Sequence, residues 1–106
     1  MKVTGWKQVA TQTVSGITYT CEYNGEGLCK VKANGTDVSL ASGHSHETTN
    51  WISTPYKPST TQIRLSERSV SNNILFYMWT GGNCGITNTY SSTKTANIQF
   101  EVVYGV

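Results

Sequence analysis

The stretch from Asn73 to Asn88 constrains the fold more than any other part of the chain. It contains six consecutive apolar or aromatic residues, Ile74 to Trp79, so both faces of an extended strand would need cover here. The Gly81-Gly82 pair that follows predicts a tight turn, because glycine adopts positive φ at no steric cost. We therefore expect a hairpin of two strands, Asn73–Trp79 and Cys84–Asn88. Its second face would be covered by a facing sheet or by another subunit.

Other segments alternate between apolar and polar residues, which is typical of strands with one wet face. Asn24–Gly27 is an expected turn, and Asn34-Gly35 is the strongest hairpin dipeptide in the chain. Pro55 and Pro58 predict an extended, rigid connector, since proline lacks a donor and fixes φ. The further strands expected are Trp6–Gln12, Ile17–Tyr23, Leu28–Ala33, Thr36–Leu40, Thr61–Leu65 and Ala96–Tyr104.

With 106 residues, this pattern predicts a single domain over 1–106. The expected fold class is all-β, an antiparallel β-sandwich or barrel of about eight short strands with almost no helix.

The composition limits the classes of partner that we expect. Charged residues make up 13% of the chain, the net charge is +2 and there is no Lys/Arg run, so we expect no nucleic-acid partner. No apolar segment is long enough to span a membrane, and the N-terminus lacks the apolar core of a signal peptide.

The three cysteines, Cys21, Cys29 and Cys84, are odd in number and lie in strand-like runs. This pattern favours buried free thiols. A Cys21–Cys29 bridge is the alternative, if two strands place these residues opposite each other.

No catalytic motif is present in the sequence. There is no nucleophile elbow, phosphate loop or H-E-x-x-H motif, and nothing in the spacing pairs any two of the six acidic residues. We therefore expect a binding or structural protein without catalytic residues.

His44 and His46 have the only spacing that suggests a metal site. On an extended chain, residues i and i+2 point the same way. Two histidines cannot complete a metal shell, but three chains around an axis would supply six ligands for iron or zinc. The alternative is a solvated loop beside Glu47. Otherwise we expect no cofactor.

Two long polar loops, Gly43–Asn50 and Asn88–Lys94, combine hydrogen-bonding groups with an aromatic side chain. A sugar ring stacks its C–H face on an aromatic ring while polar groups bind its hydroxyls. The candidate ligand-binding residues are therefore His44, His46, Glu47, Asn50, Asn88, Tyr90 and Lys94. The alternative is that both loops are only solvated turns.

Much of the chain resembles the C-terminal head domain of tailed-bacteriophage tail fibres and receptor-binding proteins. The resemblance rests on W-I-S-T-P-Y-K-P-S at Trp51–Ser59, on the glycine-turn hairpin that ends in Gly85-Ile86, and on F-E-V-V-Y-G-V at the C-terminus. In the family's connector, leucine-proline precedes tyrosine-arginine-proline. Here Thr54 replaces the leucine and Lys57 replaces the arginine.

This resemblance implies a homotrimeric head in the virion tail, forming the C-terminal piece of a longer chain, which recognises a bacterial surface glycan or protein. It also implies that metal on the trimer axis could be held by H-x-H motifs, although such tips repeat the motif and this chain has it once. Two alternatives are a trimerising cap without a ligand and a free-standing lectin-like protein.

Overall fold

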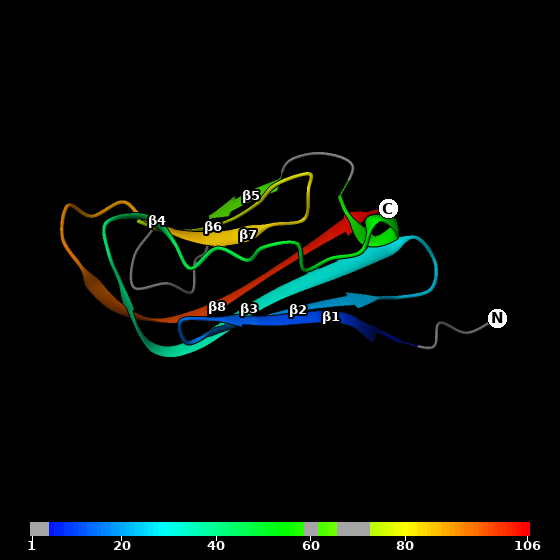
Figure 1. Ribbon diagram of the computed structural model, residues 1–106, viewed down its shortest axis with the longest axis horizontal. Helices are drawn as coiled ribbons and strands as arrows, with labels where there is room; N and C mark the ends of the chain where they lie inside the picture. Colours follow the sequence, from blue (N-terminus) through cyan, green and yellow to red (C-terminus); the bar gives the residue numbers. More distant parts are fainter. Residues whose placement is uncertain (1–4, 59–61, 66–72) are drawn as a thin grey trace.

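Two antiparallel sheets of four strands each lie face to face in the computed structural model, which describes residues 5–58, 62–65 and 73–106 (Figure 1). Sheet I has the order β1-β2-β3-β8, with strands Lys7–Val14, Ile17–Tyr23, Leu28–Leu40 and Lys94–Gly105. Sheet II has the order β4-β7-β6-β5, with strands Gly43–Ser45, Cys84–Asn88, Ile74–Met78 and Gln62–Leu65. The expected all-β sandwich is confirmed.

The predicted hairpin is confirmed as β6 and β7, the two inner strands of sheet II. The backbone N–H of Trp79 donates to the Asn83 carbonyl at 2.9 Å, and that of Gly82 donates to the Trp79 carbonyl at 2.8 Å. Gly82 has a φ of 93°, so the turn does use the conformational freedom of glycine.

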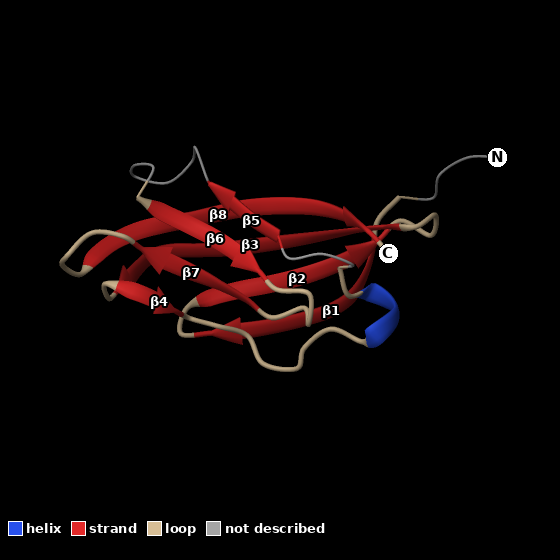
Figure 2. Ribbon diagram, turned by 90° about the horizontal axis from the view of Figure 1, so that it is seen from above, coloured by secondary structure: helices blue, strands red, loops and turns tan. Residues whose placement is uncertain are grey.

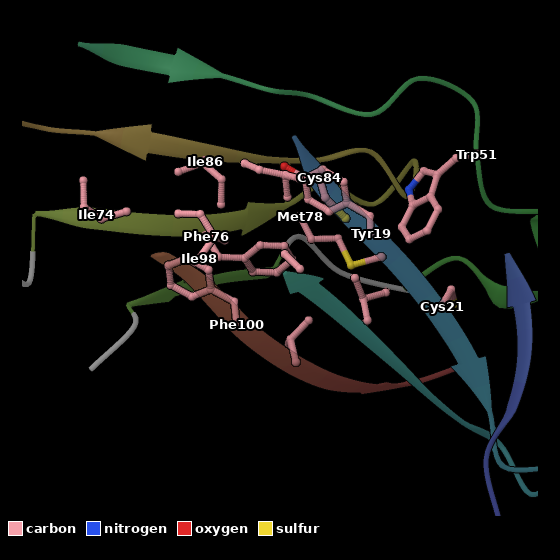
Figure 3. Close-up of a cluster of buried hydrophobic side chains, with 14 of the residues drawn as sticks. Tyr19, Cys21, Trp51, Ile74, Phe76, Met78, Cys84, Ile86, Ile98 and Phe100 are labelled. Carbon is pink, nitrogen blue, oxygen red and sulfur yellow. The ribbon is translucent and has the colours of Figure 1, made fainter. Parts of the chain in front are cut away.

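The core lies between the sheets, where the inner faces of β6 and β7 meet side chains of sheet I (Figure 3). Ile74, Phe76 and Met78 are fully buried and alternate with residues of the outer face. The ring of Phe76 stacks on that of Phe100 from β8, with centroids 5.7 Å apart. The inner face of the β6–β7 hairpin is therefore covered by sheet I of the same chain.

Asn34-Gly35 does not form the predicted hairpin, because β3 continues through it to Leu40. The register with β8 shifts between Gly35 and Val38, and Asp37 takes a φ of 51° while its N–H donates to Asn97 Oδ1 at 2.9 Å. The Asn34-Gly35 dipeptide is thus accommodated by a β-bulge within a continuous strand. Gly35 is needed for close packing instead, since a Cβ there would lie 2.9 Å from the Gly16 carbonyl oxygen.

The prediction of an extended proline connector is only partly right. Thr54–Tyr56 forms one turn of 3-10 helix with Pro55 in its first turn, where a missing N–H is tolerated. Tyr104 Oη fastens this turn to sheet I by donating to the Tyr56 carbonyl at 2.7 Å. Among the described residues no helix has the length and apolar character needed to cross a membrane.

Leu28–Ala33 and Thr36–Leu40 are joined in the single strand β3. The remaining predicted strands lie within two residues of the observed ones, although residue 61 falls outside the described part. Within the described ranges, one strand was missed. Gly43–Ser45, expected as loop, pairs with β7 as the short strand β4 (Figure 2). This difference matters for function, because it places His44 on a sheet.

The cysteines are buried free thiols, as expected. Cys21 pairs with Val31 and Cys29 with Tyr23, so the two thiols are not directly opposite each other. Burial raises the pKa of the Cys29 thiol to about 12, which keeps it protonated at ordinary pH.

Candidate functional site

β4 holds His44 on the outer face of sheet II. The residue pairs with Thr87 of β7, and its Nδ1 lies 2.6 Å from Thr87 Oγ1. The imidazole also meets the ring of Tyr77 edge to face, with centroids 5.0 Å apart. The side chain is exposed to solvent, so its orientation is set by these two contacts while its surface stays accessible.

Tyr77 connects His44 to the rest of this face. It lies opposite Gly85, and although it is on the outer face only 3% of it is exposed. Its hydroxyl donates to the Glu47 carboxylate. Burial, with a further contribution from this hydrogen bond, raises the pKa of Tyr77, so the hydroxyl stays a donor and fixes the carboxylate.

Trp79 follows β6 on the same face, and 47% of it is exposed. Its ring meets that of Tyr77 edge to face, with centroids 5.8 Å apart and an interplanar angle of 67°. His44, Tyr77 and Trp79 therefore form an aromatic row across β4, β7 and β6. Glu47 is tied to the middle of the row and Thr87 to one end.

The aromatic row offers an exposed indole, a fixed carboxylate, an imidazole and a hydroxyl on one surface. Such a combination suits a sugar ligand, since an aromatic ring can stack on the apolar face of a pyranose while polar groups bond to its hydroxyls. Of the seven residues predicted for ligand binding, the structure brings two, His44 and Glu47, to this site.

His46 lies just beyond β4 and takes a φ of 57°, so the extended geometry assumed for the histidine pair ends at Ser45. Its backbone carbonyl accepts a 2.6 Å hydrogen bond from Tyr19 Oη, which ties this point to sheet I. The described residues contain no group of three or more His, Cys, Asp or Glu side chains that could hold a metal. Metal bound between three chains remains a prediction.

Asn88 lies inside the molecule, with 1% of it exposed, although it was predicted to bind ligand. Its Nδ2 donates to the carbonyls of Leu40 and Ser92, each at 3.0 Å, and its Oδ1 accepts from the Tyr90 N–H at 2.9 Å. The amide therefore shapes the connection between β7 and β8 and is already engaged by the backbone.

Tyr90 and Lys94 lie in or beside that connection, beyond the end of β7. The Lys94 ammonium sits 4.7 Å from the centroid of the Tyr90 ring, and Ser42 Oγ donates to the Tyr90 carbonyl at 2.6 Å. This connection is at one tip of the sandwich, coloured orange at the left of Figure 1. The seven predicted ligand-binding residues are therefore not gathered in one place.

Asn50 is exposed, with a φ of 48°, and its backbone N–H donates to Asn83 Oδ1 at 3.0 Å. This bond places Asn50 beside the turn that follows Trp79.

Sequence reasoning missed Tyr77, Trp79 and Thr87 as site residues. The alternation of β6 does place Tyr77 and Trp79 on one face, and that of β7 places Thr87 there. The sequence alone leaves the cover of the second face open between a facing sheet and another subunit, because nothing in it shows that Glu47 and His44 return to this face.

A scan of family models and a search of curated proteins found no match to this chain.

Proposed function

We propose that this protein is a carbohydrate-binding head that recognises glycans on a bacterial cell surface. The aromatic row on the outer face of sheet II is its binding site. The observation that carries this proposal is Trp79, which is 47% exposed and is held edge-on by a buried tyrosine whose hydroxyl fixes a carboxylate.

The physical basis is preorganisation. Tyr77 contacts both neighbouring rings and the Glu47 carboxylate, so the groups of the site are already positioned before a ligand arrives. A site that is ordered in advance loses less side-chain entropy on binding. The indole face supplies the stacking surface, and the Glu47 carboxylate accepts hydrogen bonds from sugar hydroxyls.

The setting of this activity is proposed from the resemblance to tail-fibre heads. The chain would form a homotrimer at the tip of a virion tail, with its receptor glycan on the bacterial surface. The β-sandwich is compatible with this setting. A trimer would have to leave Trp79 uncovered, so its interface would lie elsewhere on the head.

The test measures binding of bacterial cell-wall polysaccharide to the wild type and to two variants by isothermal titration calorimetry. Trp79→Ala should weaken binding by about tenfold, equivalent to about 1.4 kcal/mol, because the stacking surface is lost. Glu47→Gln keeps the size of the side chain and an acceptor for Tyr77, and should weaken binding by a smaller factor.

Tyr90→Ala is the control, since this residue lies at the tip of the sandwich. A folded Trp79→Ala variant that binds as the wild type does would exclude the aromatic row as the site. A stable trimer that binds neither cells nor polysaccharide would favour the trimerising cap.

A further inference from the structure

The opposite broad face of the molecule, the outer face of sheet I, carries rows of polar side chains. Asn34 of β3 lies opposite Gln99 of β8, and Lys32 lies opposite Glu101. In β2, Thr18 and Thr20 continue the same two rows. Between these side chains lie buried residues such as Val31 and Ala33, so the polar groups all point away from the core.

This face is hollowed at the boundary of β3 and β8. The hollow has a volume of about 460 Å³ and is lined by Lys32, Asn34, Gln99, Phe100 and Glu101. Ligand sites in proteins commonly have volumes of about 300–1,000 Å³, so the hollow is large enough for a small ligand. Two amides, an ammonium and a carboxylate line it, which provides both donors and acceptors.

The charges on this face balance. Lys32 Nζ lies 3.4 Å from Glu22 Oε1, and Glu101 lies opposite Lys32 on the other side. With Lys30, two cationic and two anionic side chains share this part of the sheet. An ionic ligand would find as much repulsion as attraction, whereas a neutral ligand with many hydroxyl groups could use every one of these donors and acceptors.

An aromatic ring lies on the same sheet, next to Lys30 of β3. Trp6 is 37% exposed, and the Lys30 ammonium sits 4.3 Å from the centroid of its ring. Lys30 and Lys32 share one face of β3 and are separated by about 7 Å along the strand. Trp6 precedes β1, which β2 separates from β3, so only a ligand of several sugar units would reach from the hollow to the indole.

We propose that the outer face of sheet I is a second carbohydrate site. A neutral sugar unit occupies the hollow and bonds through neighbouring hydroxyls to Lys32, Asn34, Gln99 and Glu101, while further units of a longer ligand extend along the sheet towards Trp6. The ligand class follows the proposed function, but the site is separate from the aromatic row. Because the two sites lie on opposite faces of the sandwich, one head would bind two glycan segments at once.

The test is a titration of the whole ¹⁵N-labelled protein with neutral trisaccharides built from glucose, galactose or N-acetylglucosamine, followed by amide chemical shifts. Binding should move amides of β3 and β8 as well as those of β6 and β7. Asn34→Ala combined with Gln99→Ala should weaken the β3 and β8 response by tenfold or more and leave the β6 and β7 response unchanged. Trp79→Ala should do the reverse.

Trp6→Ala supplies an independent readout. It should weaken binding of a trisaccharide at the hollow but leave binding of the matching monosaccharide unchanged, because only the longer ligand reaches the indole. Glu101→Gln replaces the double variant if that protein fails to fold, and it should weaken the β3 and β8 response.

Three results would overturn the second site. The first is a sugar response confined to β6 and β7. The second is an unchanged β3 and β8 response in the folded variants of the hollow. The third is a shift of the β3 and β8 amides with protein concentration alone, which would identify this face as a contact between copies of the chain. Loss of the β6 and β7 response alone would count against the aromatic row and leave the second site standing.

Discussion

The ring of Tyr77 lies over Gly85, its partner on the neighbouring strand. A Cβ added at Gly85 would lie 2.5 Å from Tyr77 Cζ and 2.8 Å from Glu47 Cγ, so the missing side chain leaves the space that both residues occupy. An aromatic ring that covers a cross-strand glycine shields the exposed backbone of the sheet. The same arrangement brings the Tyr77 hydroxyl to the Glu47 carboxylate.

Gly85→Ala should therefore disrupt both the sheet and the site. We expect a loss of about 1–3 kcal/mol in the free energy of unfolding, because the ring and the Glu47 side chain must both move. Urea denaturation would measure this loss. Gly81→Ala is the matched control, since a Cβ there meets nothing within 4 Å, and it should change stability by less than about 0.5 kcal/mol. Equal effects of the two substitutions would contradict the packing argument.

Asn88 should matter for stability rather than for ligand binding. Asn88→Ala leaves the buried carbonyl of Leu40 without its donor and removes two further bonds that shape the β7–β8 connection. We expect a loss of about 2–3 kcal/mol in the free energy of unfolding, measured by urea denaturation.

Asn97→Ala is the comparison for this second prediction. Its Oδ1 also accepts from a backbone N–H, that of Asp37, but the site is exposed and water can replace the bond. The loss should stay below about 1 kcal/mol. A loss for Asn97→Ala as large as that for Asn88→Ala would show that burial does not set the difference.

The sequence predicted the sandwich because period-two alternation depends only on which face of a strand is buried. It failed at Asn34-Gly35, where the turn propensity is local but the pairing of β3 with β8 extends along both strands. The bulge at Asp37 accommodates the unfavourable dipeptide, and β3 continues. A tertiary contact, the approach of Gly16, decides the role of Gly35.

Stability should fall at high pH because of the buried thiols. Burial raises the pKa of Cys29 to about 12 from an ordinary value of 9.0, and it raises the pKa of Cys21 and Cys84 too. The unfolded chain therefore loses these protons first. The free energy of unfolding should receive the full contribution of Cys29 below about pH 8 and lose it between about pH 9 and 12, by up to about 1.4 kcal/mol per pH unit.

The measurement is urea denaturation at several pH values from 7 to 11. Lysines also titrate in this range, so the comparison is with Cys29→Ala, whose stability should fall less steeply with pH. Identical slopes for wild type and variant would mean that Cys29 deprotonates as easily in the folded protein as in the unfolded chain.

The candidate site was only partly predictable for a different reason. Composition pointed to His44 and Glu47, because polar loops with aromatic neighbours suit sugars. No local pattern reports that Gly43–Ser45 joins β7, which is the pairing that carries His44 to Tyr77. The Tyr77–Glu47 hydrogen bond could not be predicted from a local pattern either, since the two residues are 30 positions apart in the sequence.

The last prediction separates binding from assembly. The run Ile74–Trp79 suggested a trimer interface because it is apolar on both faces. Of the three residues of this run on the outer face, Tyr77 is covered by residues of its own chain, while Leu75 and Trp79 remain at least partly exposed. If Trp79 binds sugar, Trp79→Ala should keep the oligomeric state of the wild type and weaken polysaccharide binding by about tenfold. Sedimentation equilibrium would report the assembly, with three chains of 11.6 kDa expected for the trimer.

Leu75→Ala is the matched control for this experiment, because it removes apolar surface from the outer face of the same hairpin but leaves all three rings of the aromatic row in place. It should bind polysaccharide as the wild type does. Dissociation of a trimer by Trp79→Ala, with binding per chain unchanged, would instead assign the outer face of sheet II to the subunit interface. Glycan recognition would then depend on the hollow between β3 and β8, where Asn34 and Gln99 face each other.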